Sequence, residues 1–254
     1  MKNSKDSKTM MYYYYFFPEI KSFLSKTEKN KIEKELFDLD QNIFQNFEEK
    51  RQLGENESYI CTLIRNDSVE EFISFVNRAN LSLSNAQIKH SIFETNSFLI
   101  ENNETTLIEY SAFFGSIQIF QYLRMNNVEL TPSLWLYAIH SNNPDLIHLL
   151  EEYHVEPKNK SFEECLKEAI KCHHNDVARY IQDNLLIGKV DESKILSSIF
   201  AYYNYCFFPK SLGGKFTLHY LCQYNHYTLV KLLLESNELD INSEIVLYIN
   251  NKFI

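Results

Sequence analysis

Five segments of this chain repeat the same order of residue types, and this self-similarity constrains the fold more than any other feature. They begin at Ser58, Thr106, Ser133, Glu164 and Phe216. The third residue is apolar in every segment: Ile60, Ile108, Trp135, Leu166 and Leu218. The tenth residue belongs mostly to types that tolerate a left-handed backbone at a helix end: Asp67, Gly115, Asn142, His173 and Asn225. Because a second apolar pattern follows each tenth residue, every segment is predicted to be helix, tight turn, helix.

Neither helix of such a unit can bury its apolar stripe alone, so neighbouring units are expected to stack around a shared core. The intervals from Thr106 to Ser133 and from Ser133 to Glu164 are close to one unit. The other two intervals are longer and contain insertions, at residues 81–103 and 187–213. We expect additional helices at 85–99 and 193–204. The sequence leaves open whether the insertions are degenerate repeats or single helices with long loops.

The stretch GKFTLHYLCQYNHYTLVKLLLESNELDIN, residues 214–242, resembles an ankyrin repeat. Its Phe216-Thr217-Leu218-His219 stands where that family has Thr-Pro-Leu-His, and its Asp240-Ile241-Asn242 resembles the closing Asp-Val-Asn. Residues 106–123 are the next best match, with Gly115 at the family's glycine between the helices. The units that start at Ser133 and Glu164 lack the threonine and the histidine and are degenerate.

The resemblance implies an all-α ankyrin-repeat solenoid, in which the threonine caps the first helix and the histidine ties adjacent turns. With its aromatic N-terminal helices, the chain is similar to the expanded ankyrin families of some protists, which carry an uncharacterised helical domain before the repeats. We expect a disordered tail at 1–11, an N-terminal helical cap at 12–57 and repeats at 58–254. The repeat units are predicted near residues 58–103, 104–130, 131–157, 158–213 and 214–242, with a terminal turn at 243–254.

The N-terminal region carries its own helical pattern. Ile32, Leu36, Leu39, Ile43 and Phe47 follow one another at spacings typical of one helix face. Thr27 is the predicted N-cap, and Gly54 is predicted to end the stretch. Such a helix either shields the first repeat, as terminal units of solenoids do, or binds a partner helix.

Charge and cysteine usage exclude several classes of protein. The formal net charge is −9 and no stripe of Lys and Arg is present, which argues against a nucleic-acid partner. Five scattered cysteines form no CxxC pair and suit a reducing compartment. The aromatic run at 10–17 is too short and too polar for a membrane span or a signal peptide. We therefore expect a cytoplasmic protein without a membrane association.

Two groups of metal-ligand residue types were weighed against structural roles. They are His219, Cys222 and His226, and Cys165, Cys172, His173 and His174. Both groups straddle a predicted turn, so a structural role is the preferred interpretation. The chain also has no GxGxxG, Walker or GxSxG motif. We expect no metal, no cofactor and no enzymatic activity.

In the resembled fold, the residues just before each helix–helix turn face a concave groove. The candidate partner-binding residues in this register are Arg65, Tyr110, Phe113, Phe114, Tyr137, His140, Lys171, Tyr220, Gln223 and Tyr224. Exposed aromatic side chains of this kind are typical binding anchors. The resemblance thus implies a non-enzymatic scaffold that holds a protein partner.

Two alternatives stay open. The first is an adaptor or regulatory subunit that acts through the N-terminal helices. The second arises from the apolar segment 245–254, which predicts an exposed apolar face that docks another element or continues into a longer repeat array. The sequence names neither the partner nor the oligomeric state.

Overall fold

A computed structural model describes residues 11–102, 104–186, 192–208 and 217–236. The described residues are helical and contain one isolated β-bridge, between Gln87 and Thr106, in place of a sheet. The contacts divide the chain into two compact units. The first contains residues 1–111 and 116–129, and the second contains residues 112–115 and 130–254. The all-α prediction is confirmed.

In the described part of the first unit, a helical stretch at residues 11–15 is followed by four elements that surround one core. These are α2 (Phe17–Ile20), η1 (Lys21–Phe23), α3 (Lys26–Leu39) and α4 (Phe47–Leu53). The core consists of Phe17, Ile32, Leu36, Ile43, Phe47 and Phe93. The predicted N-cap, Thr27, is wrong. Ser25 caps α3 instead, in a capping box with Glu28 that satisfies two free backbone N–H groups at the helix start.

The helical pattern from Ile32 to Phe47 does not form one helix. The chain leaves α3 at Asp40, whose carboxylate accepts the backbone N–H of Asn42 at 2.9 Å. Asn46 then takes a left-handed conformation before α4. Asp and Asn favour such local turns, and they override the apolar spacing. Gly54 ends α4 with φ +67°, as predicted.

Two helix pairs follow in the first unit. They are α5 (Tyr59–Arg65) with α6 (Val69–Arg78), and α8 (Leu107–Phe114) with α9 (Ile117–Met125); the last residues of α8 belong to the second unit. The insertion between the pairs was expected to be helical over 85–99. In the described part of that range, only α7 (Ser97–Glu101) is helical. The residues before α7 form turns and extended chain, and the Asn96 side chain caps the start of the helix.

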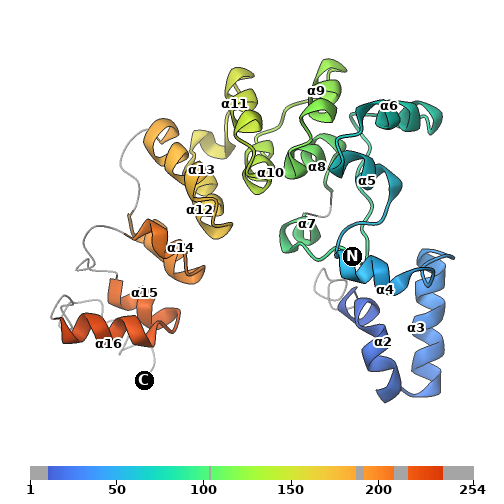
Figure 1. Ribbon diagram of the computed structural model, residues 1–254, viewed down its shortest axis with the longest axis horizontal. Coiled ribbons are helices and arrows are strands. Elements are labelled where there is room, and N and C mark those ends of the chain that lie inside the picture. The colour runs from blue at the N-terminus through green and yellow to red at the C-terminus, as the bar shows by residue number, and fades with distance from the viewer. Residues whose placement is uncertain (1–10, 103, 187–191, 209–216, 237–254) are drawn as a thin grey trace. The chain divides into compact units, whose positions relative to one another are not determined.

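The second unit continues the pairing (Figure 1). Its first pairs are α10 (Leu134–Ser141) with α11 (Pro144–Glu152), and α12 (Glu163–Lys171) with α13 (Asn175–Tyr180), which η3 (Ile181–Leu185) extends. The short turn η2 (Lys158–Lys160) precedes α12. Then come α14 (Glu192–Ala201), η4 (Tyr205–Phe207) and the pair α15 (Thr217–Gln223) with α16 (Tyr227–Glu235). The helix expected in the second insertion is present as α14.

The first helices of successive repeats contact one another. In the second unit, α12 packs against α10 and α14, and α14 packs against α15. Their contact residues are fully buried, as for Trp135, Leu166 and Phe200. Each helix thus covers the apolar stripe of the next, which is the stacking expected of units that cannot close a core alone.

The turns between paired helices repeat in detail. All five predicted turn residues have positive φ: Asp67, Gly115, Asn142, His173 and Asn225. Tyr203, after α14, has positive φ as well. At most of these turns the next residue's N–H bonds a carbonyl five residues back; His174 to Ala169 at 3.0 Å is one case. This is the Schellman closure of a helix end, so the turn prediction is confirmed and a sixth turn is added.

After every left-handed residue of these turns except Asp67, a polar side chain bonds a carbonyl of the preceding repeat. Ser116 Oγ donates to the carbonyl of Ile64, and Asn143 Nδ2 to that of Gly115. His174, Asn204 and His226 donate to the carbonyls of Ile139, Ile170 and Phe200 at 2.7, 2.8 and 2.8 Å. We call these hydrogen bonds the turn ties. They bring a side-chain donor to these carbonyl groups, of which those of Ile64, Ile139 and Ile170 also accept a backbone N–H.

The roles implied for threonine and histidine are met in part. Thr106 caps α8 through a box with Glu109. In α15, Thr217 Oγ1 and His219 Nδ1 are buried without a hydrogen bond in the described structure, so that expectation is wrong there. Of the predicted tail at 1–11, residues 1–10 lie outside the described residues, and Met11 is helical. Asp240–Asn242 and the apolar segment 245–254 also lie outside them.

Candidate functional site

The two predicted surface residues of the first unit form a buried polar pair. Tyr110 is 1% exposed, and Arg65 Nη1 donates to its hydroxyl at 3.1 Å. Arg65 also donates to the carbonyl of Asn56 at 2.8 Å and pairs with Glu55. Burial raises the pKa of Tyr110. Tyr110 is therefore not the exposed anchor that was expected, because its ring fills the core beneath α5.

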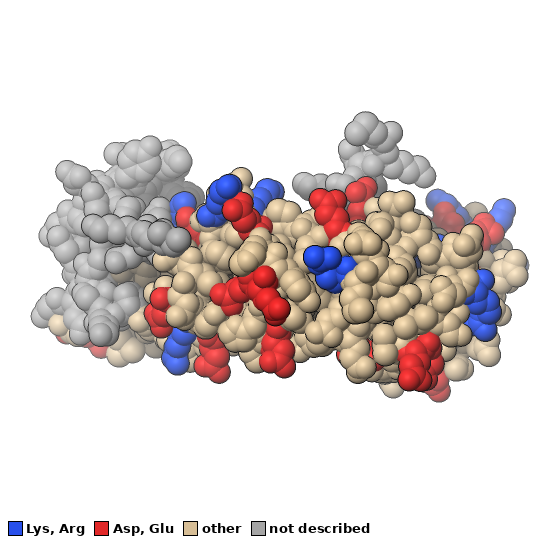
Figure 2. All heavy atoms as spheres, turned by 90° about the horizontal axis from the view of Figure 1, so that it is seen from above, with Lys and Arg blue, Asp and Glu red and all other residues tan. Residues whose placement is uncertain are grey.

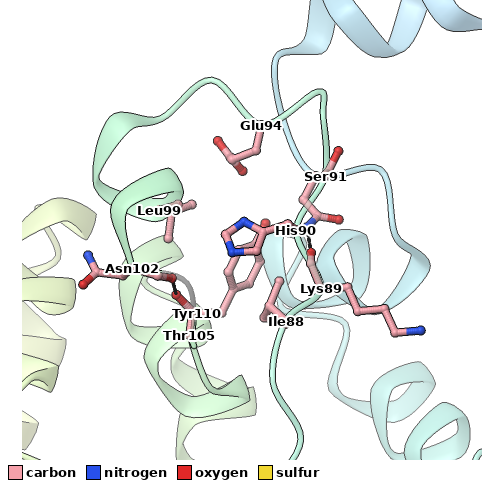
Figure 3. Close-up of a pocket in the computed structure, with 10 residues that line it drawn as sticks. Ile88, Lys89, His90, Ser91, Glu94, Leu99, Asn102, Thr105 and Tyr110 are labelled. Atoms are coloured by element: carbon pink, nitrogen blue, oxygen red, sulfur yellow. Dashed lines mark hydrogen bonds between the residues drawn. The ribbon is translucent and has the colours of Figure 1, made fainter. Parts of the chain in front are cut away.

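Two cavities in the first unit share Glu94. The smaller, about 20 Å³, has room for roughly one water, and Figure 3 shows its lining residues, among them His90, Ser91 and Tyr110. The larger, about 250 Å³, is lined by Tyr12, Tyr15, Phe16, Ile92 and other mainly apolar residues. Glu94 Oε2 is buried and has no hydrogen bond. Burial raises the pKa of this carboxyl, against a lowering by the Asn96 backbone N–H.

In the second unit, Phe113 and Tyr137 are 8% and 4% exposed, so they are core residues and not the expected anchors. The ring of Phe113 stacks on His140, with centroids 5.0 Å apart and an interplanar angle of 24°. Phe114 is half-buried, with its ring edge-on to Phe113. Phe113 and Phe114 differ in exposure because successive residues of a helix such as α8 point in different directions.

His140, Glu168, Lys171 and Cys172 form one cluster at the ends of α10 and α12. His140 Nε2 lies 2.9 Å from Glu168 Oε1, and Lys171 Nζ lies 2.8 Å from the same oxygen. Cys172 Sγ lies 3.5 Å from His140 Nδ1 and 3.8 Å from Nε2. The side chains of His140 and Glu168 are 10% and 17% exposed. Sequence reasoning assigned His140 and Lys171 to one surface and placed Cys172 with its sequence neighbours, but it missed Glu168 and this convergence.

Charge and burial compete in this cluster. Burial raises the pKa of Glu168, but the hydrogen bonds from His140 and Lys171 outweigh it and leave the pKa below its ordinary value. Burial, followed by the Glu168 charge, raises the pKa of Cys172 to about 11. The cluster therefore holds a carboxylate next to a protonated thiol.

The remaining predicted surface residues lie on α15 beside an unforeseen group of tyrosines. Tyr220 and Tyr224 are half-buried and stack with centroids 6.4 Å apart, and Gln223 between them is exposed. Tyr202, Tyr203 and Tyr205, after α14, are 42%, 56% and 41% exposed. We call these five tyrosines the tyrosine cluster. Three adjacent tyrosines within YYNYCFF were the sequence signal that could have revealed it.

Three of the four histidines considered as ligands in the sequence have structural partners. His173 and His174 contact the carbonyls of Tyr202 and Ile139, while His226 bridges the Phe200 carbonyl and the Tyr205 hydroxyl. Cys165 is 3% exposed, and burial raises its pKa to about 12. Within the described residues, Cys172 is grouped with His140 and Glu168 and not with its sequence neighbours.

In the described part of the chain, no helix is both long and apolar enough to cross a bilayer.

Comparison with known proteins gives one partial match. Residues 125–210, which run from the end of α9 to η4, match a family model described as a domain of unknown function, DUF3447. Neither the curated proteins nor the solved structures contain a match. The chain is thus similar, over less than half of its length, to a family of unknown function.

Proposed function

We propose that this protein is a non-enzymatic interaction module that holds a protein partner on the tyrosine cluster of its second unit. The single observation that carries the proposal is the exposure of Tyr202, Tyr203 and Tyr205 together at one helix–helix turn. Tyrosine is enriched among residues that dominate binding energy, because a rigid ring offers apolar area and a hydroxyl offers a hydrogen bond.

The cluster is held in place before any partner arrives. The hydroxyl of Tyr224 bonds Ser197 at 3.0 Å, and the hydroxyl of Tyr203 donates to the carbonyl of Tyr224 at 3.4 Å. Tyr205 bonds His226, which also makes a turn tie. Side chains fixed in this way lose little conformational entropy on binding, which favours affinity.

The surface charge supports a protein over a nucleic acid as the partner. On the face in Figure 2, Lys and Arg of the described residues are interspersed with Asp and Glu and form no continuous band. Near the cluster, Lys171 lies over the Tyr202 ring at 6.0 Å from its centroid, but it is also paired with Glu168. Cations that are already neutralised add little to phosphate binding.

An ankyrin-like solenoid is our proposal for the architecture. It is supported by the recurring helix pairs, by the positive φ at each turn and by the turn ties. A cytoplasmic location is supported by cysteines that are all free, as expected in a reducing compartment.

The test is affinity capture from the source cell, with mass spectrometry of the bound proteins. The variant Tyr202→Ala/Gln223→Ala removes exposed side chains. The matched control is Tyr227→Ala, because Tyr227 is 76% exposed on the second helix of the same pair. We expect the double variant to lose the partners that wild type and control retain. Equal capture by all three would reject the surface.

A second candidate places the interaction on the N-terminal helices. Large apolar side chains are exposed there, with Phe23 at 89%, Leu39 at 60% and Phe37 at 49%. Where such side chains form one patch, they often mark a contact surface. If Phe23→Ser/Phe37→Ser loses the partners and the double variant at Tyr202 and Gln223 keeps them, this candidate replaces the first.

A further inference from the structure

Three different metal-ligating side chains converge in the second unit, and their ligand atoms lie within 4.8 Å of one another. The distances from His140 Nε2 are 2.9 Å to Glu168 Oε1 and 3.8 Å to Cys172 Sγ. Ligands of a tetrahedral Zn²⁺ ion lie about 3.4 to 3.6 Å apart, given bonds of ~2.0–2.1 Å to N or O and ~2.3 Å to S. The observed distances bracket that range, so small rotamer changes bring the three atoms to one face of a tetrahedron.

The local structure holds these side chains together. Glu168 and Cys172 are four residues apart on α12 and therefore share one face of that helix. His140 comes from the last turn of α10, which packs against α12. Phe113 stacks on the His140 ring and restricts its orientation. A ligand set on two packed helices, with one ring fixed by a neighbour, needs little reorganisation to bind an ion.

We propose that His140 Nε2, a Glu168 carboxylate oxygen and Cys172 Sγ form a binding site for a divalent transition metal of the Zn²⁺ class. Mixed nitrogen, sulfur and oxygen ligands suit this class better than Mg²⁺ or Ca²⁺, which prefer oxygen alone. With three protein ligands, the fourth position is left for water or for a side chain of a bound partner.

The reaction balances in protons and charge. The thiol of Cys172 releases its proton to solvent as the sulfur–metal bond forms. The His140 proton on Nε2, donated to Glu168 in the metal-free protein, is lost to solvent, and one proton from solvent is taken up on Nδ1, so that Nε2 is free to bind the ion. The thiolate and the carboxylate together neutralise the two charges of the ion. Lys171 Nζ gives up its bond to Glu168 and stays near the Tyr202 ring, which already lies 6.0 Å from it.

Cys172, His140 and Glu168 are also the residue types of a Cys–His–acid nucleophilic site. The surroundings of Cys172 decide between a nucleophilic site and a metal site. A nucleophile needs a thiolate in the resting protein. The Cys172 thiol is partly buried, and the Glu168 carboxylate beside it repels a free thiolate. A bound cation removes this obstacle because it stabilises the thiolate directly. Metal binding is thus the chemistry that this setting favours.

The test is a titration of the full-length, metal-free protein with Co²⁺, which takes tetrahedral Zn²⁺ sites and absorbs light. We expect one equivalent of Co²⁺ to produce a thiolate-to-cobalt charge-transfer band. Zn²⁺ should displace the ion and remove the band. Cys172→Ser should abolish it, and His140→Gln and Glu168→Gln should each weaken binding at least tenfold. Cys222→Ser, at an exposed thiol outside the cluster, is the matched control and should bind like wild type.

Lys171→Ala separates a binding role from a structural one. Since Lys171 competes with the ion for Glu168, its removal should tighten Co²⁺ binding severalfold. Far-UV circular dichroism and the emission of Trp135, the only tryptophan, verify that each variant is folded. Absence of the charge-transfer band in wild type, or its persistence in Cys172→Ser, would overturn the proposal. Rapid alkylation of Cys172 by iodoacetamide in metal-free protein at neutral pH would overturn it in favour of a nucleophilic thiol.

Discussion

His174 Nδ1 lies 2.7 Å from the carbonyl oxygen of Ile139, which joins the turn after α12 to the last turn of α10. Ile139 is fully buried, and its carbonyl at the end of α10 also accepts the backbone N–H of Asn142 at 3.1 Å. The same relationship recurs between Asn204 and Ile170 and between His226 and Phe200. The stack is therefore held by directional bonds as well as by apolar contact.

Removal of the His174 tie should destabilise the second unit. His174→Ala removes a hydrogen bond between two neighbouring helix pairs, and we expect the free energy of unfolding to fall by about 0.5–1.5 kcal/mol in urea denaturation. His174→Asn should recover part of that loss, because Asn143 and Asn204 make the tie at their own turns. If alanine and wild type unfold at the same urea concentration, the tie does not stabilise the stack.

Asp67 is expected to support α9 in the first unit. Its carboxylate accepts the backbone N–H groups of Gln118 and Ile119, each at 2.9 Å, at the start of that helix. Asp67→Gly keeps the left-handed turn but removes both bonds, and should cost about 1–2 kcal/mol of unfolding free energy. Asp67→Asn keeps one acceptor and should lose less. Equal stability of all three proteins would contradict the capping role.

Gly115 is expected to tolerate no side chain. Its φ is +68°, and an added Cβ would lie 3.2 Å from Asn143 Nδ2 and 3.3 Å from Ser141 Cβ. Gly115→Ala should therefore lower the free energy of unfolding by at least about 1–2 kcal/mol. The control is Asn142→Gly, at the next left-handed turn, which should be neutral within about 0.5 kcal/mol. Thermal melts of the two variants give the comparison.

Glu94 makes the stability of the first unit depend on pH. Burial raises the pKa of its carboxyl in the folded state. The folded protein therefore holds this proton more tightly than the unfolded chain does. The resulting contribution to the free energy of unfolding is complete below the pKa of a Glu carboxyl in the unfolded chain, about 4.3. It is lost as pH rises through the raised pKa of Glu94 in the folded protein.

Glu94→Gln should remove that loss while keeping an acceptor for the Asn96 backbone N–H. We expect the variant to be more stable than wild type at pH 7 and to lose this advantage towards pH 4. Urea denaturation of both proteins at the two pH values isolates the carboxyl from other titrating groups. A difference that grows towards pH 4 would contradict the sign.

The pattern of residue types predicted the helix pairs and their turns well. Left-handed residues at Asp67, Asn142 and Asn225 follow from local chemistry, because Asp and Asn tolerate positive φ and end an apolar stripe. Local chemistry also explains the errors. Asp40 and Asn46 interrupt a helix that apolar spacing alone extends, and Ser25 caps better than Thr27 because Glu28 completes its box.

The site was harder to predict because it depends on which side chains two packed helices bring together. Tyr110 and Phe113 precede their turn as expected, but helix packing buries both. Glu168 meets His140 only because α10 and α12 stack, and no spacing within either helix reveals that contact. Tyr203 is exposed because it lies in the left-handed turn that follows α14, and the sequence pattern did not predict a turn there.

The most direct test of the proposed function is site-specific photo-crosslinking, with benzoyl-phenylalanine placed at position 202, 223 or 227 and the products mapped by mass spectrometry. The account predicts that one protein partner is crosslinked from positions 202 and 223, and not from position 227 on the second helix of the last pair. Crosslinks from position 227 alone, or equally from all three positions, would contradict a partner held on the tyrosine cluster.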